Sequence, residues 1–241
     1  MLFRSYAALM SNRKRIINRE ISWLHFNERV LQEAMDVNNP IIERLKFLGI
    51  FSNNRDEFFR VRVASMRRLA RIQNKKGKKT NINASSILKQ INAKVEEQEK
   101  LYNQTFDQIV EELKAHGIIF LDEKQLNKKQ GDFVQDYFKT KVIPHLFPIM
   151  LKNIINSDAL QDNATYLGVS LKDSSKKKED DYALIMVPSD VISRFLIIPS
   201  DNSNSYIIML DDVMRYCMGE IFGPFGFDLF KAYTIKFTRD A

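Results

Sequence analysis

The fold is decided by residues 40–72, PIIERLKFLGIFSNNRDEFFRVRVASMRRLARI. Asn39 can cap a helix that begins at Pro40, because proline suits the first helical position, where the backbone N–H has no helical partner in any case. Apolar residues then recur at steps of three and predict one buried face: Ile42, Leu45 and Leu48. We expect this helix to end at the polar run 52–54, since the apolar pattern breaks there.

A second helix is predicted to start at Asn54. Asn54 and Glu57 have the spacing of a capping box, in which the first side chain bonds the backbone three residues later and the second bonds back. The apolar residues that follow form one broad arc: Phe58, Phe59, Val61, Val63, Met66, Leu69 and Ile72. The stretch therefore predicts two consecutive helices that share a buried side.

The arginines of this second helix point in two directions. Arg60 and Arg67, with Arg71, fall on the side away from the apolar arc. Arg62 falls inside the arc, and Arg55 points nearly the same way. An unpaired buried charge is very costly, so Arg62 needs a partner. It either stays at the rim paired with a carboxylate, or it binds an anion beside a helix N-terminus.

Positive charge concentrates in the same region. The chain carries a net charge of +7, and residues 55–79 hold ten Lys and Arg against two acids. Such a stripe attracts polyanions over long range, and Arg60, Arg62 and Arg67 are the candidate contacts for phosphate or a polyanion. The plainer alternative is a solvated helix face followed by a basic loop at 73–85.

Composition excludes several classes of protein. The 241 residues are 44% hydrophobic and 28% charged, which is ordinary for a globular protein with one large or two small domains. The sequence has no apolar run of eighteen residues that would span a membrane, and residues 1–12 are expected to be an irregular leader rather than a signal peptide. A single cysteine, Cys217, forms no internal disulfide. We expect a cytoplasmic protein, with a peripheral position at the inner membrane as an alternative.

Two further helices are predicted to complete an antiparallel helical bundle over residues 13–117. The first covers 18–37 and places four residues on its apolar face, Trp23, Phe26, Val30 and Ala34, with Leu24 and Leu31 flanking them. The second covers 86–116 and ends at Gly117. His25 is not expected to carry chemistry, because no orienting carboxylate is expected beside it. His116 and His145 are expected to be structural.

After Gly117 the pattern changes to a mixed α+β domain over 118–241. Residues 118–121 form a short apolar run. Strands are expected at 165–172, 182–188, 195–198, 206–210 and 232–238, and helices at 132–141 and 211–221. Residues 174–181 form the polar hairpin, and 223–227, GPFGF, form a turn. No glycine pattern typical of a phosphate-binding loop is present in the sequence. The fold class is therefore α+β, with a helical bundle followed by a mixed domain.

Two stretches carry a resemblance to a known family. NREISWLHFNERVLQEA (18–34) and NPIIERLKFLGIFSNNRDEFFRVRVA (39–64) resemble the amino-terminal region of bacterial polyphosphate kinases of the first type. The similarity extends more weakly through PSDVISRF (188–195), LDDVMRYC (210–217) and AYTIKFTRDA (232–241). Enzymes of that family continue for several hundred residues further, so we expect an amino-terminal and middle-domain fragment, truncated at its C-terminus.

The resemblance implies a mechanism and a binding residue. These enzymes reversibly transfer the terminal phosphate of ATP to polyphosphate, through a phosphohistidine and with Mg²⁺. The accepting histidine and the magnesium-associated groups lie in carboxy-terminal domains, so no catalytic or metal residue is expected here, and the chain alone is expected to be inactive. Asn54 matches a nucleotide-binding position, whereas Arg55 replaces the usual leucine. The implied partners are ATP, ADP and polyphosphate, with a homodimer or higher assembly in the complete enzyme.

Two non-catalytic alternatives remain. A helical nucleic-acid-binding module would explain the basic stripe, but exposed aromatic residues are not interleaved with it, so nucleic acid is the weaker candidate. A structural docking module would explain the apolar faces but would leave Asn54 and Arg62 without a role.

Overall fold

The computed structural model describes residues 17–76, 83–153, 160–175, 177 and 179–241. The expected leader at 1–12 lies outside these residues, as do the middle of the expected 73–85 loop and part of the hairpin at 174–181. The described residues form two compact units, one within residues 1–109 together with 240–241 and the other within 110–239. Their architecture, helices first and then a mixed α+β region with two sheets, confirms the predicted fold class.

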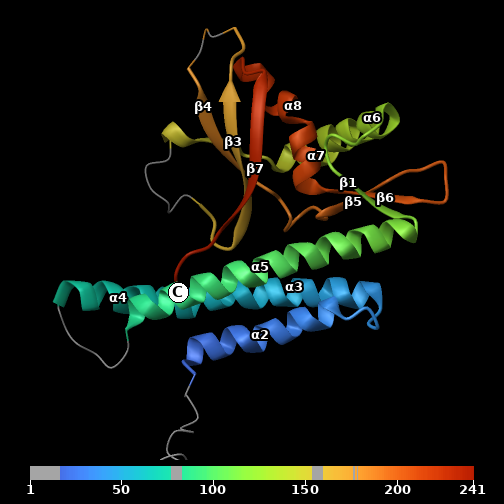
Figure 1. The fold of residues 1–241 in the computed structure, drawn as a ribbon. Coiled ribbons are helices and arrows are strands. Elements are labelled where there is room, and N and C mark those ends of the chain that lie inside the picture. Colours follow the sequence, from blue (N-terminus) through green and yellow to red (C-terminus); the bar gives the residue numbers. More distant parts are fainter. Residues whose placement is uncertain (1–16, 77–82, 154–159, 176, 178) are drawn as a thin grey trace, which may run out of the picture. The chain divides into compact units, whose positions relative to one another are not determined.

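The first unit is built from helices. They are α2 (Arg19–Met35), α3 (Ile41–Glu57), a π-helical segment (Phe58–Val63), α4 (Ala64–Lys76) and the greater part of α5 (Ala84–Ala115). Asn18 caps α2, because its side-chain oxygen accepts a hydrogen bond from the Glu20 N–H at 2.9 Å. Figure 1 shows α2, α3 and α5 running side by side.

The predicted break at 52–54 is wrong. Helix α3 runs without interruption from Ile41 to Glu57 and continues through the π-helical segment into α4. The irregularity that the sequence suggested therefore lies several residues later, where Phe58–Val63 holds an extra residue in the turn. The predicted cap at Asn39 is also wrong: Pro40 holds the N-cap position, and the Asn39 side chain donates to the carbonyl of Glu33 at 2.9 Å.

The buried faces of α2 and α3 agree with the predicted ones only in part: Ala34 and Leu48 are buried as predicted. On α2 the apolar core residues are Leu24, Leu31 and Ala34, whereas the predicted core residue Phe26 is 63% exposed. On α3 the buried residues are Arg44, Leu48 and Phe51, while Ile42 is exposed. Trp23 fits its predicted place on the apolar face of this helix better, since its ring stacks on Phe58 with centroids 4.5 Å apart.

The second unit holds two sheets. One has the order β1-β6-β5, with β1 (Ile118–Leu121) parallel to β6 (Ser205–Met209) and β5 (Phe195–Ile198) antiparallel to it. The other has the order β2-β4-β3-β7 and is antiparallel throughout. Its strands are β2 (Ile149–Met150), β4 (Asp181–Met186), β3 (Ala164–Lys172) and β7 (Leu229–Phe237). All five predicted strand segments are present as β3–β7; β5 has the predicted bounds, and the ends of the others differ by up to three residues. The apolar run 118–121, for which no strand was predicted, forms β1.

The helices of this unit are short. They are α6 (Lys128–Tyr137), a second π-helical segment (Phe138–Val142), α7 (Leu210–Tyr216) and α8 (Met218–Phe222). A capping box formed by Asn127 and Gln130 starts α6 four residues earlier than predicted. The predicted turn at 223–227 is present, and Gly226 takes a left-handed backbone there with φ +79°.

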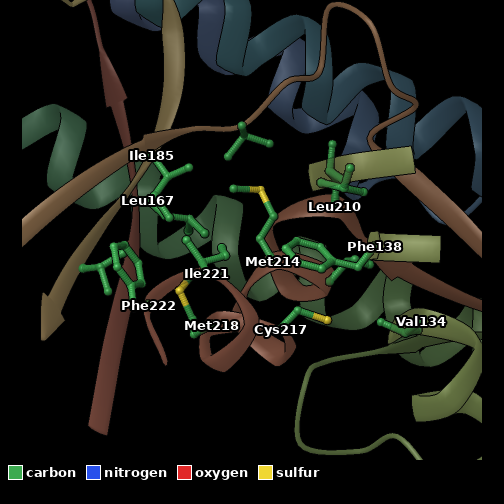
Figure 2. Close-up of a cluster of buried hydrophobic side chains, with 14 of the residues drawn as sticks. Val134, Phe138, Leu167, Ile185, Leu210, Met214, Cys217, Met218, Ile221 and Phe222 are labelled. Carbon is green, nitrogen blue, oxygen red and sulfur yellow. The ribbon is translucent and has the colours of Figure 1, made fainter. Parts of the chain in front are cut away.

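One apolar core joins these helices to the four-stranded sheet. Figure 2 shows Met214 of α7 lying between Leu167 of the sheet and Phe138, and Met218 of α8 belongs to the same cluster. Cys217 belongs to this core and is 1% exposed. Burial raises the pKa of its thiol to about 12, so the thiol stays protonated and unreactive at neutral pH.

Helices α6 and α7 approach each other closely at Gly131, so this position leaves no room for a larger side chain. A methyl group on Gly131 would overlap the hydroxyl oxygen of Tyr216 and would lie 3.0 Å from the ring carbon that carries it. We expect Gly131→Ala to lower the free energy of unfolding by about 1–3 kcal/mol, because overpacking forces side chains away from their preferred positions. Urea unfolding measures the loss. Adding Tyr216→Phe removes the overlapping oxygen and should restore most of the stability; an unrestored double variant would contradict the steric explanation.

Candidate functional site

Asn54 lies inside helix α3 rather than at a helix start. Its side-chain amino group donates to the side-chain oxygen of Asn27 on α2, with Nδ2 and Oδ1 3.0 Å apart. The predicted capping box with Glu57 is therefore wrong, because α3 continues through Glu57 and the side chain faces α2. Asn54 is partly buried, and its nucleotide-binding role, which the family resemblance implies, stays a prediction.

Asn27 supports Asn54 from a fully buried position. It is 0% exposed, and its Nδ2 donates to the backbone carbonyl of Phe51 at 3.1 Å. Both its amide groups therefore have partners, as a buried polar side chain requires. Sequence reasoning missed Asn27, although it lies three residues after Leu24 and four before Leu31, on the buried side of α2.

Arg55 packs on aromatic rings. The centre of its guanidinium lies 5.7 Å from the ring of Phe51 and 5.9 Å from the ring of Tyr102 on α5. These distances are typical of cation–π contacts, and they explain how arginine can occupy a position where the family resemblance implies leucine. Burial raises the pKa of Tyr102, and the charge of Arg55 offsets only part of this rise.

Arg62 is paired with a carboxylate. Its Nη1 lies 3.2 Å from Oε2 of Glu20, whose side chain is 4% exposed, while 35% of the Arg62 side chain reaches solvent. Arg19 bonds the other oxygen of Glu20 at 3.0 Å. The first of the two alternatives for Arg62, a rim position with a carboxylate partner, is thus the observed arrangement. Sequence reasoning missed Glu20, because hydrophobic periodicity does not pair residues that are 42 positions apart.

A cleft of about 370 Å³ opens beside this ion pair. Its lining consists of Arg19, Glu20, Val61, Arg62, Ser65, Met66 and Leu69. Asn54, Arg60 and Arg67 do not line it, so the structure does not bring the predicted contacts into one cleft. Arg67 is exposed on α4. The backbone carbonyl of Arg60 accepts a hydrogen bond from the Ala241 N–H at 3.0 Å.

His25 has the carboxylate neighbour that the sequence analysis did not expect. Its Nδ1 lies 3.3 Å from Oε2 of Glu28, one helical turn later, and Lys94 lies 2.8 Å from the other oxygen of Glu28. Burial acts to raise the pKa of Glu28. The hydrogen bonds and charges of Lys94 and His25 together lower it by more than burial raises it, so the pKa of Glu28 lies below its ordinary value. His116 and His145 are both exposed.

A second charged cluster links α7 to strand β7. Arg215 contacts Asp212 and Thr234 and lies 3.4 Å from Oδ2 of Asp211, which also accepts from Thr234 at 2.8 Å. Burial and the neighbouring charge of Asp211 raise the pKa of Asp212 to about 6, although Arg215 acts in the opposite direction. A further acid, Glu123, adds to the rise.

This raised pKa predicts how stability depends on pH. The folded protein holds a proton on Asp212 more tightly than the unfolded chain, where the pKa is ordinary, near 3.8. The contribution of this group therefore favours folding below about pH 4 and is lost as the pH rises through about 6. We expect Asp212→Asn to make the free energy of unfolding fall less steeply over that window, measured by urea unfolding at several pH values. If the free energy of unfolding changes with pH in the same way for the parent and for Asp212→Asn, this expectation is contradicted.

The described residues contain no group of three His, Cys, Asp or Glu placed to hold a metal ion. Within the same part of the chain, no helix combines the length and apolar character that crossing a membrane requires.

Comparison with known proteins identifies the two regions. The polyphosphate kinase N-terminal domain family matches residues 16–121, and the polyphosphate kinase middle domain family matches residues 129–241. The polyphosphate kinase of Vibrio parahaemolyticus is 38% identical over 236 residues, and that of Escherichia coli K12 is 38% identical over 240 residues. Each comparison covers 96% of this chain.

A solved structure agrees with these relatives. The crystal structure of polyphosphate kinase from Porphyromonas gingivalis matches 93% of this chain, with a TM-score of 0.81 and 32% sequence identity. This chain spans 33% of that protein, and 33% and 34% of the Vibrio and Escherichia relatives. With both family models matched along nearly its whole length, the chain belongs to the polyphosphate kinase family and carries that family's N-terminal and middle domains.

Proposed function

We propose that this chain supplies the N-terminal and middle domains of an enzyme that reversibly transfers the terminal phosphate of ATP to inorganic polyphosphate. The observation that carries the proposal is the match of both family domains over 16–121 and 129–241. Phosphoryl transfer depends on positioning and charge stabilisation, and the resemblance assigns the accepting histidine to domains beyond those matched here. The chain's own part is then to help bind the nucleotide and the polyanion.

Asn54 is the proposed nucleotide contact. It is partly exposed, and its amide is held by a fully buried neighbour, so its orientation is fixed before a ligand arrives. Pre-ordering of this kind lowers the entropy that binding costs. The family resemblance, through the run SNNRDEF, is the reason for choosing Asn54 over its exposed neighbour Asn53.

Arg60, Arg62 and Arg67 are proposed contacts for polyphosphate. Support comes from the positive charge of residues 55–79 and from the exposure of Arg67. Glu20 neutralises part of the Arg62 charge, so less of that charge is left to attract a polyanion. We further propose a homodimer or larger assembly, the domain division at 117/118, and a cytoplasmic location. Mg²⁺ is proposed to accompany the nucleotide, and we assign no residue of this chain to it.

A chimera tests the proposal. Residues 16–241 would replace the matching segment of the Escherichia coli K12 relative, and polyphosphate formation from ATP would be measured. We expect an active chimera, whereas the 241-residue chain alone should neither form polyphosphate nor take up label from γ-labelled ATP with Mg²⁺. An inactive but folded chimera would contradict the assignment, as would stable label on the chain alone.

Within the chimera, we expect Asn54→Ala to lower kcat/KM for ATP about tenfold, equivalent to about 1.4 kcal/mol, because a transition-state binding contact is lost. Asn53→Ala is the matched control: it removes the same side chain one position away, from an exposed site. It should keep kcat/KM within about twofold. Equal effects of the two variants would show that Asn54 has no special role in nucleotide use.

A further inference from the structure

Two arginines meet one buried carboxylate at the cleft beside the start of α2. Glu20 is 3% exposed, and each of its oxygens accepts from a different arginine: Oε1 from Arg19 at 3.0 Å and Oε2 from Arg62 at 3.2 Å. All three side chains line the same cleft of about 370 Å³. Because one carboxylate holds both guanidiniums, their positions are set before a ligand arrives.

The two arginines offer hydrogen-bond donors to this cleft. Arg19 bonds Glu20 through Nε and Nη2, and Arg62 does so through Nη1. A guanidinium has five N–H donors. Among the contacts of the described residues, each arginine therefore keeps a nitrogen that no protein acceptor uses. Guanidiniums suit oxyanions such as phosphate, so the cleft favours a compact anion.

The same cleft also offers hydrogen-bond acceptors. Oε2 of Glu20 has room for a second donor, because Arg62 is its only donor within the described part of the chain. The hydroxyl of Ser65 donates to the carbonyl of Val61 at 2.8 Å, so its oxygen is left to accept. Ser65 lines the cleft together with Glu20. A ligand that suits both kinds of group must accept hydrogen bonds from the arginines and donate one in return.

We propose that this cleft binds a phosphate group that still carries a proton, and that Glu20 selects this group over fully ionised anions. Orthophosphate carries such a proton, and so does the terminal group of a polyphosphate chain below its last ionisation, near pH 6 for phosphate esters. Internal polyphosphate units have no proton, so Glu20 disfavours them. The choice of a chain terminus rests on the proposed function, whereas the selection of a protonated phosphate does not.

Charge alone predicts the opposite preference. Sulfate has the tetrahedral shape of phosphate, but it is a dianion without a proton, whereas orthophosphate at about pH 6 is mostly a monoanion. If only the two arginines mattered, sulfate would bind at least as tightly. With Glu20 in the cleft, sulfate sets an ionised oxygen against a carboxylate that needs a donor. Water reaches Arg62, so we expect a preference of about tenfold rather than the much larger ratios of enclosed sites.

NMR titrations of the 241-residue chain at about pH 6 test this selection. The backbone amide signals of Arg62 and Ser65 report binding at the cleft, and the dissociation constant should be about tenfold lower for orthophosphate than for sulfate. Glu20→Gln keeps the side-chain shape but replaces an acceptor by a donor, so the preference should disappear. Glu43→Gln is the matched control, because Glu43 is an exposed acid that does not line the cleft. It should keep the parental preference.

A second pair of ligands separates the two sources of a protonated phosphate. Linear tripolyphosphate has terminal groups, whereas cyclic trimetaphosphate has as many phosphates but only internal units. If the linear form binds about tenfold more tightly, the cleft recognises the end of a polyphosphate chain. Equal binding of the two forms, with orthophosphate still preferred over sulfate, assigns the cleft to free orthophosphate.

Three results in the parent chain would overturn the inference: sulfate binding as tightly as orthophosphate, tighter binding of the cyclic form, or cleft signals that do not respond to orthophosphate. These results need no variant, so they decide the matter even if Glu20→Gln fails to fold. A folded Glu20→Gln that keeps the parental preference would show that Glu20 does not select the anion. An inactive chimera would contradict the proposed function, but it would not alter the preference for orthophosphate.

Discussion

Replacing Phe138 with alanine is expected to lower the free energy of unfolding of the second unit by about 3–5 kcal/mol. Phe138 begins the second π-helical segment, is 0% exposed, and lies among the core residues of α7 and the four-stranded sheet (Figure 2). The loss combines the removal of an aromatic ring from an apolar environment with the cavity that a rigid surrounding structure leaves behind. Urea unfolding followed by circular dichroism measures it.

Phe147→Ala is the control for this effect. Its side chain is 72% exposed, so the same change of residue removes little buried surface. We expect a change within about 0.5 kcal/mol, as for most surface substitutions. Similar losses for Phe138→Ala and Phe147→Ala would mean that the core described for this unit does not carry its stability.

Glu20→Ala is expected to lower the free energy of unfolding by about 1.5–3 kcal/mol, the range for hydrogen bonds to charged groups. Glu20 is 3% exposed and bonds both Arg19 and Arg62. Loss of a buried ion-pair partner can cost more than this when the remaining charge stays buried. Here both arginines reach solvent, so they can be rehydrated and the loss is smaller. A double-mutant cycle with Arg62→Ala isolates the pair, and a coupling near zero would contradict a stabilising contact.

The same substitution separates the structural role of Arg62 from the proposed binding role. Removing Glu20 frees the charge of Arg62, so affinity for polyphosphate should rise as stability falls if Arg62 contacts the polyanion. The rise should weaken at high salt, because such contacts are screened. Glu43→Ala provides the control, since Glu43 is an exposed acid paired with Lys46 at 2.7 Å. If both variants raise affinity equally, only net charge matters.

The sheets could be predicted from the sequence because their signals are local. Strand β5 (Phe195–Ile198) has the predicted bounds, and the short apolar run noted at 118–121 forms β1. The pairing of β1 with β6 was not predicted, since 87 residues separate Ile118 from Ser205 and the strands are parallel. Neither segment contains a sequence pattern that indicates the strand with which it pairs. Pairing between strands that are distant in the sequence depends on the packing of the whole unit.

The candidate site was harder to predict because it depends on contacts between distant helices. Asn54 was expected to cap a helix, yet its side-chain amide donates a hydrogen bond to Asn27. The local sequence motif around Asn54 does not indicate that Asn27, on another helix, is this partner. Arg62 was placed correctly inside the apolar arc, and its need for a counter-charge followed from that position. The identity of the counter-charge, Glu20, required the structure. Local chemistry therefore showed that Arg62 needs a partner, but it did not reveal the buried Asn27, and only the fold shows which residues the two contact.

The π-helical segment at Phe58–Val63 has a consequence for the evolution of chain length. A π-helical turn is equivalent to an α-helical turn that has gained one residue. The segment lies between two regular helices and places Phe58 and Val63 in the core. An insertion or deletion of a single residue in a packed α-helix rotates every later side chain by about 100° relative to the earlier ones. At this segment one residue can be lost or regained by tightening or widening one turn, so we expect the junction between α3 and α4 to tolerate a change of length by one residue better than the interior of either helix.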